Sequence, residues 1–432
     1  MDKITFYDES SSEEEELTVP LPEGWEDRIT PTNKVYYVNH KERVTQWEHP
    51  VSGKIRSVTS FLPYGWGRQE DTEGNRIFVE YLAQRAAYTD PRLLTNPHRK
   101  RYVLKIAKAQ GRFVENSFTD RTTAAEVIEG VDMTGKVAIV TGSNSGIGYE
   151  TARCLASQGC HVIMACRDMT LGNSKAENII KIFPQAKLSV IKLDLSQKES
   201  VEQFSSEFLS LQLPLHILVL NAGVLGLNWA LSSYECEMQF SINYLGHFHL
   251  FYLLKDILKQ SAPARVVCVS SEAHRYTNLN HSNLDLDTSL SKTKPRDYTA
   301  ITAYGNSKLC CIYLALEIHR RYDQDGIHAY AVHPGVLIST RLSRNWCMYR
   351  LLYFASRCFT KTVAQGASSV VYCAASPLPA EESGLYYFNC KPSRPSNSAQ
   401  NSHPAGILWD VSLRLIGEGD RREEDLSADT ET

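Results

Sequence analysis

Residues 137–148 read VAIVTGSNSGIG, an apolar run that passes directly into a glycine-rich loop. Gly142, Gly146 and Gly148 allow a tight turn in which the backbone comes close to a bound pyrophosphate. The residues that follow continue as a helix, whose first N–H groups favour negative charge. A glycine-rich loop alone is a weak signal, but its position between a buried strand and a helix strengthens it. The stretch predicts the strand, turn and helix of a dinucleotide site.

Further apolar runs follow residue 148, separated by stretches with helical periodicity. They lie at 161–165, 188–191, 217–220, 265–269 and 328–332. Strands this apolar are buried on both faces, which is typical of a parallel sheet flanked by helices. We therefore predict an α/β fold, a Rossmann-type doubly wound parallel sheet.

The ends of these strands carry the candidate cofactor site. Arg167 and Asp168 end the second strand, where an acid would bind the adenosine ribose and an arginine would pair with a 2′-phosphate. Because Arg167 comes first, the sequence favours NADP over NAD. The candidate cofactor-binding residues here are Gly142, Ser143, Asn144, Ser145, Gly146, Ile147, Gly148, Arg167, Asp194, Asn221 and Gly223.

Tyr304 and Lys308 are four residues apart, so a helix would place both on one face. Such a pair is common by chance and gains weight only from its neighbours, a serine pair after the fifth strand and Asn243. Hydride transfer to a carbonyl needs a proton for the forming alkoxide, and a tyrosine can supply it if nearby positive charge lowers its pKa. The candidate catalytic residues are Tyr304, Lys308, Ser271 and Asn243, with Ser271 also binding the substrate oxygen.

Over residues 132–417 these motifs resemble the short-chain dehydrogenase/reductase family in their order and spacing. The resemblance favours Ser271 over Ser270 as the catalytic serine. It also implies that Lys308 holds the nicotinamide ribose and that Asn243 holds a water that relays protons. A hydrophobic carbonyl or alcohol, steroid- or retinoid-like, is the substrate it suggests. The aromatic residues within 336–359 then form a lid or pocket wall, or else a packed surface helix.

Residues 21–92 contain an internal repeat. LPEGW at 21–25 recurs as LPYGW at 62–66, a shift of 41 residues, and each copy has turn residues between aromatic and β-branched runs. Two small three-stranded antiparallel modules are therefore predicted. At about 30 residues, such a module gains enough apolar burial only from large aromatic side chains.

The first copy resembles a WW domain through its two Trp and the string YYVNH at 36–40. The resemblance implies a groove for Pro-rich peptides in the polyproline II conformation, with Pro-Pro-x-Tyr proteins as partners. The candidate peptide-binding residues are Tyr36, Val38, His40, Thr45 and Trp47. In the second copy four of these become Ile77, Tyr81, Ala86 and Tyr88. We predict that the second module binds no ligand and packs on or steadies the first.

The formal net charge of −3 hides two opposite blocks. Residues 1–20 carry seven acids and one base, whereas residues 92–121 carry eight bases and two acids. The predicted organisation is an acidic disordered tail (1–20), a first WW domain (21–51), a second one with a degenerate pocket (62–92), a basic linker (93–131), a dehydrogenase domain (132–417) and a disordered tail (418–432). The basic block is interpreted as a solvated linker rather than a nucleic-acid arm.

No apolar run is long enough to cross a membrane, and the 11 Cys have neither disulfide nor zinc spacing. We expect no metal site and a cytoplasmic protein. A nuclear location, through the basic residues 99–101, and a mitochondrial one stay open, and the oligomeric state is not indicated.

Two functions remain open. In the first, an NADP-dependent oxidoreductase is recruited to Pro-Pro-x-Tyr proteins by the first WW domain. In the second, the protein is mainly an adaptor whose dehydrogenase domain senses NADP(H) or turns over little. The resemblance supports the adaptor function as an alternative, because the member that combines these domains is known for partner binding in growth control and apoptosis. We also expect a role in Wnt signalling.

Overall fold

The computed structural model describes residues 21–59, 61–70, 74–93, 106–107, 117–279, 298–335, 361–377 and 382–418. The predicted tails, most of the basic linker and the aromatic segment 336–359 lie outside the described residues. The chain divides into two compact units, Met1–Glu115 and Asn116–Thr432.

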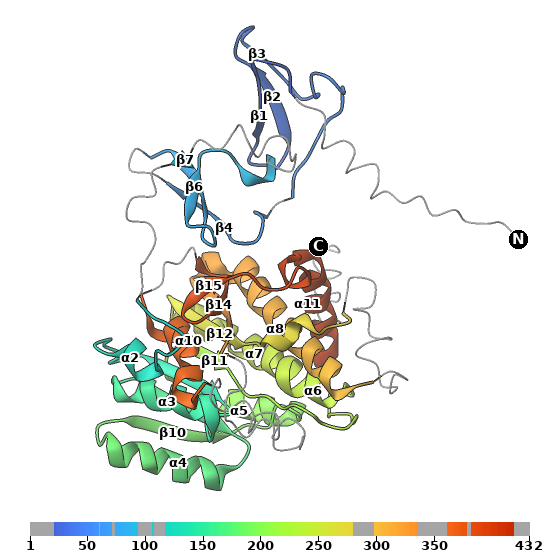
Figure 1. Ribbon diagram of the computed structural model, residues 1–432. Coiled ribbons are helices and arrows are strands. Elements are labelled where there is room, and N and C mark those ends of the chain that lie inside the picture. The colour runs from blue at the N-terminus through green and yellow to red at the C-terminus, as the bar shows by residue number, and fades with distance from the viewer. Residues whose placement is uncertain are drawn as a thin grey trace, which may run out of the picture. The chain divides into compact units, whose positions relative to one another are not determined.

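The first unit contains the two predicted modules (Figure 1). The strands of the first module are β1 (Trp25–Ile29), β2 (Val35–Asn39) and β3 (Val44–Gln46), and those of the second are β4 (Trp66–Glu70), β5 (Arg76–Glu80) and β6 (Arg85–Ala87). Each set forms an antiparallel meander, as predicted. The second sheet gains a fourth strand, β7 (Ile106–Ala107), which pairs antiparallel with β6. Part of the predicted linker is thus a sheet strand, because the edge of a small sheet offers unpaired backbone groups.

The second unit is built on an eight-stranded sheet in the order β10-β9-β8-β11-β12-β13-β14-β15. The strands are β8 (Val137–Thr141), β9 (His161–Cys166), β10 (Lys187–Lys192), β11 (Ile217–Leu220), β12 (Ala264–Val269), β13 (Ile327–His333), β14 (Tyr386–Phe388) and β15 (Lys391–Ser393). All neighbours are parallel except the last pair, β14 and β15. The predicted doubly wound sheet is confirmed. The two short strands β14 and β15 were not predicted, because three residues carry too little pattern to stand out from a loop.

Helices connect the strands and cover the sheet (Figure 1). The long ones are α3 (Gly146–Ser157), α4 (Met169–Ile182), α5 (Lys198–Ser210), α7 (Gly246–Gln260), α8 (Ala300–Tyr322), α10 (Val363–Ala375) and α11 (Ser402–Ile416). Short helical turns lie at α6 (Met238–Phe240) and, in π-helical form, at Ser241–Leu245. Helix α10 packs on α3, α5 on α7, and α8 on α11. No helix of the described residues has the length and apolar character of a membrane span.

The second unit begins earlier than the predicted residue 132. A short helix, α2 (Ala124–Ile128), starts with a capping box in which Thr123 and Glu126 bond each other's backbone N–H groups. Its Ala124, Val127 and Ile128 are buried, and the helix packs against α3 and α10. The predicted boundary is therefore too late, because a five-residue helix with an apolar face is buried although its flanks carry the charge expected of a linker.

Candidate functional site

The glycine-rich loop follows β8 and has the conformation that its glycines permit. Gly142 and Gly146 have φ angles of +66° and +58°, in the region that side chains disfavour. A Cβ on Gly142 would lie 3.0 Å from the Cα of Ala222, and one on Gly148 would lie 2.6 Å from the carbonyl oxygen of Gly142. The loop is folded too closely on itself and on the end of β11 for any larger residue at these two positions.

The loop ends at the N-terminus of α3, a 12-residue helix that begins at Gly146. Its N-cap residue, Ser145, has an extended backbone and makes no side-chain cap hydrogen bond. The first N–H groups of the helix therefore keep their capacity to bind an anion. Together with the closely folded glycines, this cradle fits the pyrophosphate of a dinucleotide.

Thr141 joins the loop to the neighbouring strand. Its hydroxyl accepts hydrogen bonds from the backbone N–H groups of Asn221 and Ala222, both at 2.9 Å, and Asn221 Nδ2 donates to the Thr141 carbonyl at 2.8 Å. Asn221 thus holds the cradle together through its side chain. Gly223 faces the catalytic residues, since a Cβ there would lie 3.4 Å from Lys308 Nζ. Thr141 was not predicted, although it directly precedes the first glycine.

Three charged residues lie at strand ends and differ in how far their side chains are engaged in local hydrogen bonds. Arg167 and Asp168 are exposed just after β9. Asp168 Oδ1 caps α4 by accepting from the N–H of Leu171 at 3.0 Å. Asp194 Oδ1 accepts from the backbone N–H and the hydroxyl of Ser196, at 3.0 and 2.7 Å. Each acid therefore has one oxygen committed to local structure, whereas the Arg167 side chain is exposed to solvent.

Helix α8 carries Tyr304 and Lys308 on one buried face. The Lys308 Nζ lies 5.7 Å from the centre of the Tyr304 ring and donates to the carbonyl of Val269, at the end of β12, at 2.9 Å. Ser271 is the neighbouring side chain whose influence lowers the pKa of Tyr304. The structure thus brings three of the four predicted catalytic residues together.

The two adjacent serines have different positions. The buried Ser270 hydroxyl donates to the Lys308 carbonyl at 2.7 Å and so ties β12 to α8. Ser271 is only partly buried, and its Oγ accepts from the N–H of Ala273 at 3.2 Å, at the start of the 3₁₀ turn Glu272–Arg275. Ser271, not Ser270, therefore presents its hydroxyl to Tyr304.

Asn243 lies in the π-helical turn. Both its side chain and its backbone carbonyl form hydrogen bonds within the protein. Its side chain bridges the backbone of Val224, at 2.8 and 3.0 Å, and the Ser307 hydroxyl at 2.9 Å. Its carbonyl oxygen accepts from His247 Nδ1 at 3.0 Å and from the Cys311 thiol at 3.3 Å. Both acceptor positions of this oxygen are used within the protein, and the predicted water relay remains a prediction.

His247 is a further residue that was not predicted. It is fully buried, and its second ring nitrogen, Nε2, lies 2.9 Å from the Thr141 hydroxyl. Since Nδ1 donates to the Asn243 carbonyl, the imidazole links the catalytic turn to the strand that carries the glycine-rich loop. Burial lowers the pKa of His247 to about 3, so the ring is neutral at physiological pH. Its position four residues after Asn243, one helical turn on, was the only available signal.

Burial, the largest influence, raises the pKa of Tyr304 to about 12, although the hydrogen bond with Ser271 works in the opposite direction. Burial also lowers the pKa of Lys308. Loss of hydration is therefore the dominant influence of the chain's own residues on the phenol, and the lowering predicted from nearby positive charge, the nicotinamide included, remains a prediction. The neutral phenol is the form that donates a proton to a forming alkoxide.

The five candidate peptide-binding residues lie together on the first module. The rings of Tyr36 and Trp47 meet edge to face with centres 6.0 Å apart, and Trp47 is 51% exposed. Val38 pairs with Thr45 across β2 and β3, and the exposed His40 bonds Glu26 through Nε2 at 2.7 Å. Since side chains alternate along a strand, Tyr36 and Val38 share the face opposite to Val35 and Tyr37, which form the core.

The second module is closed at the same positions. Ile77 and Ala86 are buried, and Tyr81 covers Gly67, where a Cβ would lie 2.8 Å from the Tyr81 hydroxyl oxygen. Gln69 Nε2 donates to that hydroxyl at 3.3 Å. Only Tyr88, at the position of Trp47, is exposed.

The end of the second module contacts the first. A short 3₁₀ turn, η1 (Pro91–Leu93), supplies Leu93 to the core that Val35 and Tyr37 form. The buried Arg92 pairs with Asp90 at 2.7 Å, and its Nη1 donates to Asn33 Oδ1 at 2.9 Å and to the Thr59 carbonyl at 2.8 Å. The two modules therefore share a core and a buried cation, and we name Arg92 and Leu93 the clamp.

Comparisons with known proteins agree with both parts of the site. The short chain dehydrogenase family matches residues 136–283, and the WW domain family matches residues 21–50. WW domain-containing oxidoreductase from Homo sapiens is 44% identical over 416 residues, which cover 95% of this chain and 96% of that protein. Its counterpart from Gallus gallus is 43% identical over 420 residues, 96% of this chain and 97% of that one.

Two further relatives cover the dehydrogenase part. Retinol dehydrogenase 12 from Mus musculus is 40% identical over 287 residues, which cover 66% of this chain and 88% of that protein. The crystal structure of an uncharacterized protein from Mycobacterium paratuberculosis aligns with a TM-score of 0.53 at 28% identity, over 67% of this chain and 96% of that one. The chain belongs to the WW domain-containing oxidoreductases, a group of short-chain dehydrogenases/reductases.

Proposed function

We propose that this protein is an NADP-dependent oxidoreductase for a hydrophobic carbonyl or alcohol, recruited to Pro-Pro-x-Tyr proteins by its first WW domain. The observation that carries the enzymatic part is the buried face of α8, where Lys308 Nζ lies 5.7 Å from the centre of the Tyr304 ring, with Ser271 as the side chain that acts on the tyrosine pKa. In the reduction, Ser271 binds the substrate oxygen and the neutral Tyr304 donates its proton to the forming alkoxide. The bound dinucleotide supplies the hydride.

The preference for NADP rests on the end of β9. Asp168 already caps α4, whereas the exposed Arg167 has a guanidinium group that can pair with a 2′-phosphate. Arg167→Ala should weaken NADPH binding by about tenfold or more, as expected for a charge-assisted hydrogen bond, and leave NADH binding unchanged. Titration of both cofactors by fluorescence checks this. An equal loss for the two cofactors would contradict the assignment.

The proposed substrate is steroid- or retinoid-like. The support is the relative named retinol dehydrogenase 12, together with the apolar composition of residues 336–359. Rates of NADPH oxidation with a panel of carbonyls graded by apolar area test this proposal. A rate that does not increase with apolar area would count against it.

The proposed partners rest on the exposed pair of Tyr36 and Trp47, which offers two rings for proline, and on Val38, His40 and Thr45 beside it for the ligand tyrosine. We place this recruitment in the cytoplasm and in growth-control and apoptosis signalling. The test is a titration of a Pro-Pro-x-Tyr peptide into the full chain, with a Pro-Pro-x-Ala peptide as the control. Equal affinity for the two peptides would show that the first WW domain does not recognise the tyrosine of the ligand.

The adaptor function is the second candidate, and the exposed pair of Tyr36 and Trp47 favours it, because partner binding at these rings does not require turnover. Tyr304→Phe separates the two candidates. We expect loss of NADPH oxidation with unchanged NADPH and peptide binding. Wild-type protein without turnover on any carbonyl, but with both kinds of binding, would favour the adaptor.

A further inference from the structure

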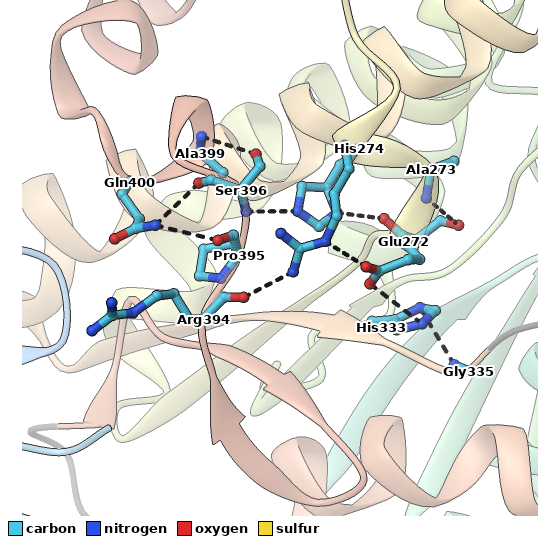
Figure 2. A network of polar contacts seen from close by, with 12 residues as sticks. Glu272, Ala273, His274, His333, Gly335, Arg394, Pro395, Ser396, Ala399 and Gln400 are labelled. Carbon is cyan, nitrogen blue, oxygen red and sulfur yellow. Dashed lines mark hydrogen bonds and ion pairs between the residues drawn. The ribbon is translucent and has the colours of Figure 1, made fainter. Parts of the chain in front are cut away.

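His274 lies fully buried beside the serine that faces Tyr304. It belongs to the turn Glu272–Arg275 that directly follows Ser271. Figure 2 shows its imidazole between this turn and the segment that carries Arg394, Pro395 and Ser396. The ring thus contacts two parts of the chain that are far apart in sequence.

The two hydrogen bonds of this ring determine its protonation. His274 Nε2 accepts from the backbone N–H of Ser396 at 3.0 Å, so this nitrogen carries no proton. The proton of the neutral ring must then be on Nδ1, which lies 2.6 Å from the carbonyl oxygen of Ser271 and donates to it. A protonated ring would place an N–H against the Ser396 N–H. Burial lowers the pKa of His274, in agreement with a neutral ring.

The same turn has a second attachment. Arg275 bonds Glu272 and, through Nη2, the carbonyl of Arg394 at 3.0 Å. Glu272 Oε2 lies 3.9 Å from His333 Nε2 at the end of β13 (Figure 2). Because burial lowers the pKa of His333 to about 3, this approach is not an ion pair.

The turn packs closely on the helix that carries the tyrosine. A Cβ on Gly305, the residue after Tyr304, would lie 2.8 Å from the Ala273 carbonyl oxygen. A displacement of the turn would therefore change the separation of Ser271 and Tyr304. Displacements of about 1 Å at reacting groups can cost on the order of 10²-fold in rate.

We propose that His274 is a positioning residue for the reaction. Its Nδ1–H holds the Ser271 carbonyl, which keeps the Ser271 hydroxyl within reach of Tyr304, while the Ser396 N–H selects the tautomer that can do so. The inference rests on the proposed function, because it takes Ser271 and Tyr304 as the reacting pair.

Two substitutions separate this role from a merely structural one. The side-chain amide of Asn lies near the position of Nδ1, whereas that of Gln lies near the position of Nε2. His274→Asn can still donate to Ser271, and His274→Gln can still accept from Ser396. We expect kcat to fall by about 10²-fold in His274→Gln and by less than about tenfold in His274→Asn, with NADPH affinity unchanged in both. The reverse order, or equal losses, would overturn the proposal.

A measurement on the wild-type full chain does not depend on turnover and uses a variant only to assign the signal. ¹⁵N NMR of the imidazole nitrogens, assigned by comparison with His274→Asn, distinguishes the tautomers. We expect protonated Nδ1 and unprotonated Nε2 at pH 7. An Nε2–H tautomer or an imidazolium would overturn the inference even in an active enzyme.

The results that would contradict the proposed function differ from those that would contradict the role of His274. An active Tyr304→Phe variant would remove the reacting pair while the expected tautomer is still observed. An inactive Tyr304→Phe beside a fully active His274→Gln would leave the reacting pair and overturn only the role of His274.

Discussion

The two modules of the first unit have the same strand order and differ in one face. In the first, Tyr36 and Val38 are partly buried and Trp47 is 51% exposed. In the second, the corresponding Ile77 and Val79 have no exposed surface, and Ala86 has 1%. The residues that hold the meander are kept in both copies, whereas the residues of the open face become core in one of them.

This difference shows that a repeat can lose a binding surface without losing its fold. Closing a face increases apolar burial, so the closed copy gains packing where the open copy keeps exposed aromatic side chains. Through Arg92 and Leu93, the closed copy also contributes core and hydrogen bonds to the open one. Four predictions test this comparison, from the largest expected effect to the smallest.

Removing the buried cation of the clamp should have the largest effect. Arg92→Met leaves the largely covered Asp90 carboxylate without its buried partner, a loss of about 3–5 kcal/mol if the pair behaves as a buried one. Protection of β2 amides against hydrogen exchange should then fall on the order of 10²- to 10³-fold in the full chain. Lys41→Met, which removes an exposed partner of the exposed Glu23, is the control, with a loss below about 1 kcal/mol. Unchanged protection of β2 in Arg92→Met would mean that the first module stands without the clamp.

Truncating the exposed tryptophan should remove peptide binding. Trp47→Ala deletes one ring of the pair with Tyr36 and should cost about 2–4 kcal/mol, or roughly 30- to 1,000-fold in affinity for a Pro-Pro-x-Tyr peptide. Tyr88→Ala, at the same position of the second module, should leave the affinity unchanged. Isothermal titration of both variants decides the matter, and a loss in Tyr88→Ala would show that the second module takes part.

Restoring the first module's residues in the second should fail. Ala86→Thr and Ile77→Tyr enlarge side chains at positions without space, so overpacking should lower stability by about 1–3 kcal/mol. Even with Tyr81→His and Tyr88→Trp added, we expect no second peptide site in a chain that carries Trp47→Ala. Peptide binding by that chain would show that the identity of these four residues, rather than the closed face, prevents binding.

The smallest effect is expected at the ion pair beside the groove. Partial burial works to raise the pKa of Glu26, but the hydrogen bond with His40 and the charge of Arg28 lower it overall. Its contribution is therefore complete at neutral pH and is lost only as the pH falls through this lowered pKa. Because the pair is half exposed, Glu26→Gln should weaken peptide binding by less than about 1 kcal/mol. Glu23→Gln, whose pair with Lys41 is more exposed, should have no effect on peptide affinity.

The dehydrogenase unit was predictable where a short motif imposes a backbone. The positive φ angles of Gly142 and Gly146 follow from the loop that their spacing predicted, and the six apolar runs are six of the eight strands, β8 to β13. Local patterns of this kind need no long-range information. Strand β7 and helix α2 were missed, because each is short and acquires its structure from a neighbour in space.

Properties that depend on burial could not be predicted from the sequence either, because burial is also set by neighbours in space. The sequence named Tyr304 and Lys308, but only the fold determines how completely the phenol and the ammonium group are removed from water. Contacts between distant segments, such as His274 with Ser396 or His247 with Thr141, left no periodic or motif signal.

The sequence by itself determined the family, the glycine-rich loop, the tyrosine and lysine on one helical face, and the repeat with its five open-face residues. These features depend on residue types and spacings along a single strand, turn or helix. Only the tertiary structure decided that Ser270 ties β12 to α8, that Ile77 and Ala86 of the second module are buried, and that Arg92 and Leu93 join the two modules. Each of these depends on which residues far apart in sequence come into contact, because those contacts determine how well a side chain is packed and how far it is removed from water.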